Sequence, residues 1–322
     1  MVDLGTPQAS MVTISYRGDL ALATALCRSA DRYLDDRIEH VLVLPRVDVP
    51  RFTPLVTDRR RIVALEDVLP PGYRRMPLPQ RIHVGPWQRR IREMWWTPAG
   101  PARGWIVQQI AKLAVPGYVR AETIVFADSD IELVAPLTLE RLAPGGRTRL
   151  YRVPGATADS AMHLRWHRAA AALLGLGPTA SPTDGGYLGA EPTGGGYLGA
   201  DYIGNLITWR RSAVIGLHGR ICLHARARWD LAVARCPALS EYILYGAYVD
   251  HVVGPEASGH TATDDDLAHA GWFYDLSTAA GVAAFADGFR PGQVAVAIQS
   301  TESFTLAERA ALIDRISAHV AG

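Results

Sequence analysis

The sequence predicts an α/β fold in which a mostly parallel sheet is flanked by helices. Short apolar runs rich in β-forming residues occupy residues 11–16, 40–44 and 61–65, and helical patterns separate them. Strands that alternate with helices in this way are typical of βαβ units. The chain of 322 residues, 48% of them hydrophobic, is long enough to bury a sizeable core. Because no convincing linker interrupts the chain, we expect a single domain with loop-rich insertions.

The individual elements follow from local patterns. Asp19 precedes a helical pattern with Leu26 and Ala30 on one face, so we expect it to be an N-cap. The run at 40–44 ends at Pro45 and suits a buried parallel strand. The later predicted elements are a helix at 104–115, a strand at 122–127, a helix at 160–174, a strand at 205–209 and helices at 241–252 and 305–320. In the last helix, Thr305 and Glu308 have capping-box spacing.

Two segments interrupt this regular pattern. Residues 70–103 are crowded with proline, arginine and tryptophan, which favours a loop-rich excursion with solvated arginines; the alternative is a basic, aromatic surface beside a phosphate-bearing ligand. Residues 183–202 hold a tandem repeat, TDGGYLGAEP followed by TGGGYLGADY, and we expect a mobile loop there. The repeat contains GxGxxG as text, but no apolar strand precedes it, so we assign no dinucleotide site.

Composition excludes several classes of function. The net charge of +1 and the 20% of charged residues give no basic field for nucleic acid, and disorder is not expected. No apolar stretch is long enough to cross a membrane, and the N-terminus does not resemble a signal peptide. The three cysteines form no CxxC pair, so we expect a reducing, cytoplasmic location. Lys112 is the only lysine in the chain.

The sharpest chemical signal is a pair of aspartates after an apolar strand. Asp128 and Asp130 follow the run at 122–127, and alternate residues of an extended backbone point to the same side. Ligands of open α/β sheets bind at the carboxyl ends of the strands. Carboxylate oxygens suit Mg²⁺ or Mn²⁺, which stabilise a leaving diphosphate. The alternative is a solvated turn that leads into the next helix.

Longer segments carry a resemblance to a known group of enzymes. GWIVQQIAKLAV followed by ETIVFADSDIELVAPL resembles the core of bacterial GT-A-fold nucleotide-sugar glycosyltransferases, and VTISYRGDLALATALCRSADRYL resembles their first βα unit. DYIGNLITWRR, SEYILYGAYV and DLAHAGW are similar to later segments of the group, and the whole set is similar to a bacterial family of glycosyltransferase-like proteins. The resemblance implies a GT-A-like catalytic domain over 1–322, a nucleotide diphosphate sugar donor and a divalent metal. Residues 11–135 would bind nucleotide and metal, and residues 136–322 would bind the acceptor and end in a helix.

The same resemblance implies roles for individual residues. Asp128 and Asp130 match the DxD metal motif, and His269 is the best match for a third metal ligand, with His260 as the runner-up. The residues that would contact the donor are Tyr16, Arg17, Asp19, Gln109, Lys112, Asp128 and Asn205. Trp105 shares the helix face of Gln109 and Lys112.

Two carboxylates are the candidate catalytic groups. Asp201 and Asn205 match a segment that lines the sugar and acceptor pocket. Glu241 begins a helix, where it can act as general base on an acceptor hydroxyl and give inversion at the anomeric carbon. The alternative is an N-terminal glutamate favoured by the helix dipole, with Ser240 as the cap. In that case a retaining mechanism without a protein base is favoured.

Two further functions remain open at this stage. A sugar-phosphate nucleotidyltransferase can use a related fold, but it predicts a glycine-rich phosphate loop with a basic residue directly after the first strand, where SYRGD offers one arginine and one glycine. A catalytically degenerate scaffold that binds nucleotide sugars is the non-enzyme alternative. Nucleotide-dependent thermal shifts without turnover would distinguish that scaffold from an enzyme.

Overall fold

The computed structural model describes residues 7–78, 81–84, 87–90, 93–155, 161–176, 199–300, 302 and 304–321. Most of the predicted glycine-rich repeat at 183–202 lies outside these residues, and so does most of its GxGxxG segment. Within the described part, no helix is both long and apolar enough to cross a membrane.

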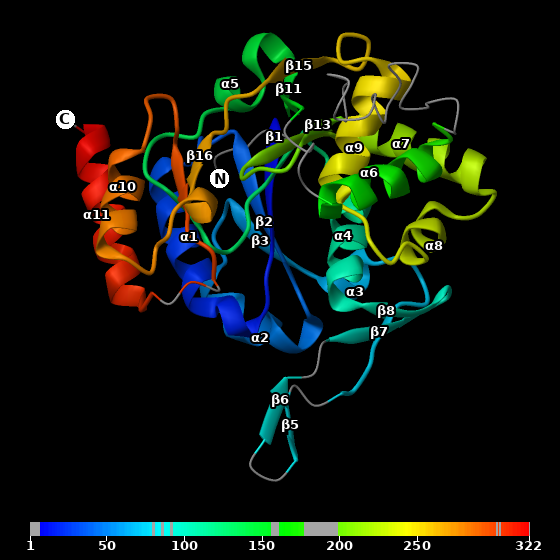
Figure 1. Ribbon diagram of the computed structural model, residues 1–322, viewed down its shortest axis with the longest axis horizontal. Helices are drawn as coiled ribbons and strands as arrows, with labels where there is room; N and C mark the ends of the chain where they lie inside the picture. Colours follow the sequence, from blue (N-terminus) through cyan, green and yellow to red (C-terminus); the bar gives the residue numbers. More distant parts are fainter. Residues whose placement is uncertain are drawn as a thin grey trace.

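A five-stranded sheet forms the centre of the molecule (Figure 1). Its strands, in spatial order, are β14 (Ile207–Arg210), β9 (Thr123–Phe126), β1 (Ala9–Ile14), β2 (Ile38–Leu44) and β3 (Arg60–Ala64). The last four strands run parallel, and β14 runs antiparallel to β9. The mixed α/β class with a mostly parallel sheet, predicted from the sequence, is therefore confirmed.

Both faces of this sheet are buried, because alternate residues of each strand enter different cores. Val12 and Ile14 of β1 pack in the largest apolar cluster together with α4 (Gly104–Ala114) and α9 (Glu241–Tyr248). Ala9 and Met11 pack in a second cluster with α1 (Leu20–Tyr33). A strand buried on both sides is hydrophobic throughout, which is why the sequence signal was strong here.

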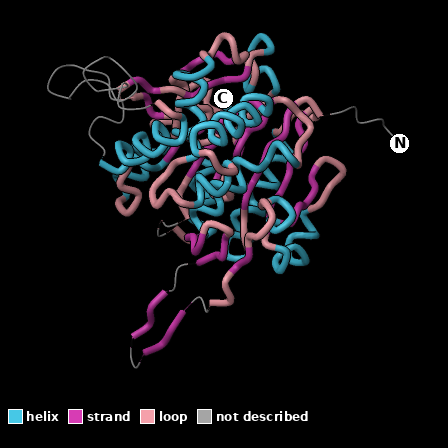
Figure 2. The backbone as a smooth tube through the Cα atoms, turned by 90° about the vertical axis from the view of Figure 1, so that its right-hand side faces the viewer, coloured by secondary structure: helices cyan, strands magenta, loops and turns pink. Residues whose placement is uncertain are grey.

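The remaining helices surround the central sheet and the helices that cover it (Figures 1 and 2). They are α2 (Val49–Phe52), α3 (Leu65–Val68), α5 (Leu139–Leu142), α6 (Ala161–Leu174), α7 (Arg211–Ala225), α8 (Trp229–Ala234), α10 (Ala279–Asp287) and α11 (Leu306–Ala321). The capping box predicted for the last helix is present, since the Glu308 amide donates to Thr305 Oγ1 at 3.2 Å and the Thr305 amide donates to Glu308 Oε2 at 2.9 Å.

Short strands form smaller sheets around the central one. They are β4 (Arg74–Arg75), β5 (Arg81–Val84), β6 (Trp87–Arg90), β7 (Met94–Thr97), β8 (Gly100–Arg103), β10 (Ile131–Leu133), β11 (Thr148–Tyr151), β12 (Val153–Pro154), β13 (Ala200–Asp201), β15 (His260–Thr263), β16 (Ala268–Ala270) and β17 (Ala295–Ala297). Strands β10, β17 and β16 form a three-stranded sheet that packs against α10 and α11.

The prediction of a loop-rich excursion at 70–103 was wrong. Strands β4, β7 and β8 pair as an antiparallel sheet, and β5 pairs with β6 in a hairpin that projects from the body of the molecule (Figure 2). Trp95 is buried and Trp96 is exposed, which is the alternation of a strand. Pro101 is tolerated because β8 is an edge strand.

The order of the central strands changes direction at β1. The chain builds β2 and β3 on one side of β1, then returns to place β9 on the other side. In open α/β sheets such a reversal leaves a crevice at the carboxyl ends of the two strands. The segments after β1 and β9 are therefore where a ligand is expected.

Candidate functional site

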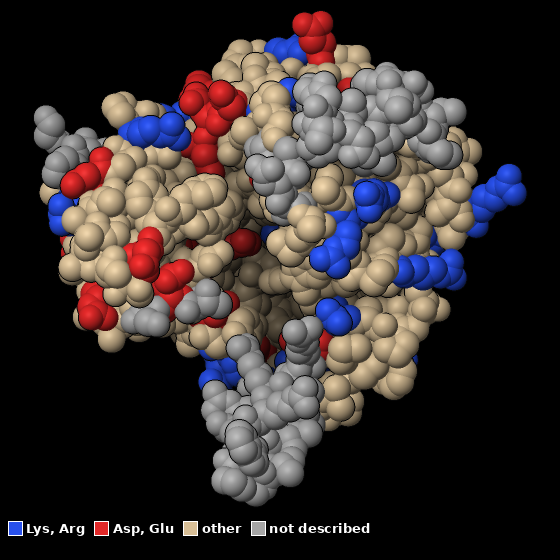
Figure 3. All heavy atoms as spheres, in the orientation of Figure 1, with Lys and Arg blue, Asp and Glu red and all other residues tan. Residues whose placement is uncertain are grey.

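A cavity of about 320 Å³ lies at this reversal point. Figure 3 shows this face of the molecule hollowed near its middle, with acidic atoms visible on the wall of the hollow. The cavity draws residues from the ends of β1 and β9, from α4 and α6, and from the start of α9. Its lining residues are Ile14, Asp19, Trp105, Gln108, Gln109, Lys112, Asp128, Ser129, Asp130, Trp166, Ile203, Ser240, Glu241, Tyr242 and Ser300.

The two aspartates of the strand end line the cavity together, as predicted. Ser129 between them donates from its hydroxyl to Ser15 Oγ at 2.8 Å, which ties the end of β9 to the end of β1. Asp130 Oδ2 accepts the Ser300 amide at 3.1 Å. Burial, together with the neighbouring Asp128 charge, raises the pKa of Asp130 to about 6. The Arg309 guanidinium, which donates to the Asp130 backbone carbonyl, opposes this rise without cancelling it.

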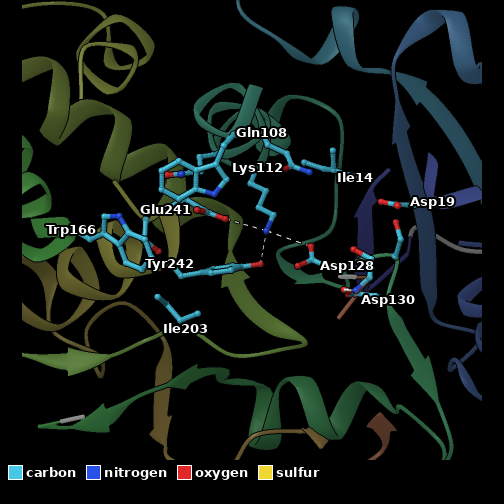
Figure 4. A pocket seen from close by; sticks show the side chains of 15 residues that line it. Ile14, Asp19, Gln108, Lys112, Asp128, Asp130, Trp166, Ile203, Glu241 and Tyr242 are labelled. Carbon is cyan, nitrogen blue, oxygen red and sulfur yellow. Dashed lines mark hydrogen bonds and ion pairs between the residues drawn. The ribbon is translucent and has the colours of Figure 1, made fainter. Parts of the chain in front are cut away.

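Lys112 occupies the centre of the cavity (Figure 4). Its ammonium donates to Tyr242 Oη at 2.7 Å and forms ion pairs with Glu241 Oε1 at 3.0 Å and Asp128 Oδ1 at 3.5 Å. The side chain is almost completely buried. Burial alone lowers the pKa of a lysine, but the charges of Asp128, Tyr242 and Glu241 outweigh it and raise the pKa of Lys112 well above its ordinary value. This lysine therefore stays charged.

Glu241 reaches the cavity from the first turn of α9. Ser240 caps the helix by accepting the Ile243 amide at 3.5 Å, as the alternative interpretation of the sequence required. The glutamate next to the cap is nevertheless buried and paired with Lys112 across the cavity. Helix capping and a position in the site are thus served by two adjacent residues.

Of the three residues predicted to bind the donor after β1, one lines the cavity and two do not. Asp19 lines it; the residue occupies the N-cap position of α1, but the capping hydrogen bond is not made. Arg17 turns away, because its Nε pairs with Asp48 Oδ1 at 2.9 Å and its amide donates to Asp48 Oδ2 at 3.0 Å. Tyr16 is more than one-third exposed and does not line the cavity.

Asp201 and Asn205 lie behind the cavity wall. Asp201 sits 3.9 Å from His163 and accepts the Ile203 amide at 3.0 Å; burial raises the pKa of its carboxyl. Asn205 is buried, with its backbone amide 3.5 Å from Asp266 Oδ2. Of this segment only Ile203 reaches the cavity. The two residues hold the segment in place and do not line the pocket.

His269 does not join the two aspartates as a metal ligand in this structure. Its Nε2 lies 2.7 Å from the Phe285 carbonyl oxygen, and because a carbonyl only accepts, this nitrogen carries the hydrogen and has no lone pair for a metal. The ring is packed against Phe285 at 4.4 Å and Tyr274 at 5.4 Å between centroids. Within the described residues, no three His, Cys, Asp or Glu side chains form a group that could hold a metal ion.

His260, the runner-up as metal ligand, belongs to a chain of hydrogen bonds that starts at the Arg210 amide of β14. Tyr245 Oη accepts the Arg210 amide at 2.7 Å and donates to His260 Nε2 at 2.7 Å, so the opposite ring nitrogen donates to Ser258 Oγ at 2.9 Å. Burial lowers the pKa of His260 to about 4, which keeps the ring neutral. Both nitrogens are already used.

Sequence reasoning missed several lining residues. Tyr242 supplies the shortest contact to Lys112, and Trp166 supplies an aromatic wall, but each occupies a helix position that reads as core. The one available signal for Tyr242 is its position next to Glu241. Ser300 lies far along the chain and comes to Asp130 only through the pairing of β17 with β10.

The two carboxylates fit a small hard cation. Mg²⁺ and Mn²⁺ are commonly held by one or two carboxylates, with water and substrate phosphates completing the coordination. Around the cavity, four carboxyl groups (Asp19, Asp128, Asp130 and Glu241) face a single ammonium group, Lys112. Burial is the main cause of the raised pKa of Asp130, and the neighbouring Asp128 charge adds to it. A cation beside Asp128 and Asp130 would offset the excess of negative charge.

Comparison with solved structures gives remote likenesses, among them the following two. The chain is similar to the apo structure of WbbM, a bifunctional glycosyltransferase, with 12% identity and a TM-score of 0.46 over 96% of this chain and 50% of that chain. It is also similar to the galactosyltransferase LgtC in complex with donor and acceptor sugar analogs, with 11% identity and a TM-score of 0.40 over 96% of this chain and 95% of that chain. The chain thus spans about half the length of WbbM.

At the level of sequence, no curated protein matches the chain. A family model matches residues 9–319, which is nearly the whole length. The chain therefore belongs to the family of unknown function DUF6492.

Proposed function

We propose that the protein is a metal-dependent glycosyltransferase that moves a sugar from a nucleotide diphosphate sugar to an acceptor hydroxyl. The observation that carries the proposal is the composition of the cavity at the reversal point of the sheet. Two aspartates, a buried charged lysine and a glutamate from the first turn of α9 meet there. The aspartates offer a place for a cation, the lysine offers a positive group for a phosphate or sugar oxygen, and the glutamate offers a base.

Charge supports the need for a metal. A diphosphate is an anion, and a cavity with four carboxyl groups and one ammonium repels it. Asp128 and Asp130 would hold Mg²⁺ or Mn²⁺, which supplies charge stabilisation of the leaving diphosphate when it is bound. Lys112 remains protonated beside them and can donate to donor oxygens.

Glu241 is the proposed general base. The acceptor oxygen forms a bond to the anomeric carbon while its proton passes to the Glu241 carboxylate. The bond from the anomeric carbon to the diphosphate oxygen breaks, and its electron pair leaves with the nucleoside diphosphate. Displacement from the opposite side inverts the anomeric configuration. A product of retained configuration would remove the base role from Glu241 and leave the transferase proposal intact.

The carboxylate side of the cavity fits the proposed nucleotide and metal half, whereas the aromatic side draws on both halves, because Trp105 also belongs to 11–135. Asp19, Lys112, Asp128 and Asp130 come from 11–135, the proposed nucleotide and metal half. Trp166, Ile203 and Glu241 come from 136–322, the proposed acceptor half. The nucleotidyltransferase alternative is disfavoured, because Arg17, the basic residue it needs after the first strand, is held by Asp48 outside the cavity.

The test is a donor panel. UDP-, GDP- and TDP-sugars are incubated with the protein and Mn²⁺, and release of nucleoside diphosphate is measured with and without EDTA. We expect one donor class to be hydrolysed or transferred only with the metal. If no donor binds in calorimetry, and Asp130→Ala leaves every measured property unchanged, the proposal is wrong. Nucleotide-dependent thermal shifts without turnover would instead identify a binding scaffold.

A further inference from the structure

The end of the cavity opposite the aspartates has a different chemistry. Trp105 from α4 and Trp166 from α6 lie there with ring centroids 5.9 Å apart and planes tilted by 37°. Trp105 is 44% exposed, although it is one of the largest apolar side chains. His163 stacks behind Trp166 at 5.0 Å, which fixes the tilt of that ring. Figure 4 shows Trp166 on the opposite side of Lys112 from Asp19 and Asp130.

A buried amide opens into the same cavity. Gln109 lies one helical turn from Trp105 on α4 and is 2% exposed. Neither its amide nitrogen nor its amide oxygen has a hydrogen-bond partner among the described residues. A buried amide without partners costs stability, and functional sites are where such groups are retained. Gln109 therefore keeps, at the wall of the cavity, a donor and an acceptor without a partner among the described residues.

We propose that Trp105, Trp166 and Gln109 form an acceptor subsite for a pyranose ring, and this inference rests on the proposed glycosyltransferase function. A pyranose has an apolar face of C–H groups and a rim of hydroxyls. The C–H face packs on tryptophan rings, and the hydroxyls satisfy the Gln109 amide. Pockets that combine aromatic walls with a few placed polar groups bind ligands of this mixed character.

Other ligand types fit this end less well. A phosphate group needs positive charge, and Trp105, Trp166 and Gln109 supply none; Lys112, the one ammonium among the lining residues, pairs with Asp128 and Glu241. A purely apolar ligand would leave Gln109 unsatisfied. Glu241, the proposed base, lines the same cavity, so a hydroxyl of the bound sugar that reaches it can pass its proton to this carboxylate when the new glycosidic bond forms.

The test uses saturation-transfer NMR with a defined panel of probes. The panel contains the methyl α- and β-pyranosides of glucose, galactose and mannose and the methyl glycosides of lactose and cellobiose, with 4-nitrophenol as the flat aromatic probe. Upfield methyl resonances of the protein are irradiated, because no probe has protons in that region, and transfer to ligand protons is measured in deuterated buffer without donor. We expect at least one pyranoside to receive saturation, strongest on the C–H protons of one ring face.

Variants locate the binding. Trp105→Ala and Trp166→Ala should each weaken the affinity for that pyranoside about threefold to tenfold, while Trp105→Phe should retain most of it. Trp96→Ala is the matched control, because Trp96 is 54% exposed and does not line the cavity. Circular dichroism melting checks that each variant is folded, and Gln109→Leu should weaken pyranoside binding without loss of fold.

The outcomes separate this inference from the proposed function. Absence of saturation transfer to every pyranoside, or transfer that is equal in wild type, Trp105→Ala and Trp166→Ala, would overturn the subsite. Binding of 4-nitrophenol alone would overturn the pyranose in favour of an aromatic acceptor. Donor hydrolysis is measured in parallel: a protein that turns over a donor but binds no pyranoside loses only the subsite. A protein that binds a pyranoside but no donor loses the transferase proposal.

Discussion

The two ends of the cavity differ in how they are built. The carboxylate end, with Asp19, Asp128 and Asp130, comes from segments that directly follow parallel strands. The aromatic end, with Trp105, Trp166 and Ile203, comes from helix faces and from a segment between two short strands. The first end carries an excess of negative charge, and the second carries apolar rings and an amide without partners. Lys112 and Glu241 lie between them (Figure 4).

The two ends of the cavity are specified by different features of the fold. Parallel strands place their carboxyl ends side by side, so the topology alone brings Asp19 near the aspartates of β9. The aromatic end depends on the packing of α6 against α9, two helices distant in sequence from α4. If the two ends act separately, substitutions at the carboxylate end will change sugar transfer without an equal change in pyranoside binding.

The largest expected effect comes from the carboxylate end. Asp130→Asn keeps an oxygen that can accept the Ser300 amide but removes a charge, so we expect transfer to fall about a thousandfold or more, because metal stabilisation of a leaving group contributes several kcal/mol. Initial rates and Mn²⁺ titration measure the loss. Asp36→Asn, at an exposed aspartate paired with Arg59, is the control and should match wild type. If pyranoside binding falls to the same extent as transfer, the two ends are not separate.

Lys112 tests the connection between the ends. Lys112→Met leaves Glu241 buried without its cation, and we expect a loss of about 3 kcal/mol in the free energy of unfolding and a fall in transfer rate of about a hundredfold. Urea denaturation and initial rates measure the two quantities. The double variant Lys112→Met/Glu241→Gln removes both charges, so stability should largely return while transfer stays lost. Recovery of activity in the double variant would show that neither group takes part in the reaction.

The carboxylate end was easier to predict from the sequence than the aromatic end. The strand runs at β1 and β9 are apolar because both faces are buried, and this made Asp19, Asp128 and Asp130 recognisable as strand-end residues. Gln109 and Lys112 followed from helical spacing on α4. The metal role of His269 stays a prediction; the contact of its Nε2 with the Phe285 carbonyl could not be foreseen, because a motif gives the chain position of a histidine but not the groups around its ring. Trp166 was missed because pairing between helices is not encoded locally.

Arg309 supports the carboxylate end, and its substitution should give the next largest effect, on the free energy of unfolding. Arg309 of α11 is 4% exposed and donates to the Ile298 carbonyl at 2.6 Å, to the Asp130 carbonyl and to Glu132 Oε1 at 3.2 Å. We expect Arg309→Met to destabilise the fold by about 3 kcal/mol, because Glu132 loses its cation and two carbonyls lose a donor. Arg315→Met on the same helix removes an exposed pair with Asp287 and should cost less than about 1 kcal/mol. If Arg309→Met and Arg315→Met lose the same free energy of unfolding in urea denaturation, Arg309 does not support the fold through these hydrogen bonds.

The smallest effect concerns Asp266, which supports the segment that carries Ile203 at the aromatic end. Its carboxylate accepts the Ala268 amide at 3.0 Å and lies 3.5 Å from the Asn205 amide, and burial raises its pKa from 3.8 to about 6. Between these pH values the folded state holds a proton that the unfolded state has released, so the contribution of Asp266 to stability falls as pH rises from about 4 to 6.

Asp266→Asn removes this titration and keeps one acceptor oxygen for the Ala268 amide. Relative to wild type, the variant should therefore gain about 2 kcal/mol between pH 4 and pH 7. Urea denaturation at intervals of half a pH unit measures the difference curve. Asp265→Asn, at the exposed neighbour, should leave the wild-type curve unchanged. A variant curve parallel to that of the wild type would show that Asp266 titrates alike in the folded and unfolded states, and the aromatic end would then carry no penalty from this buried carboxyl.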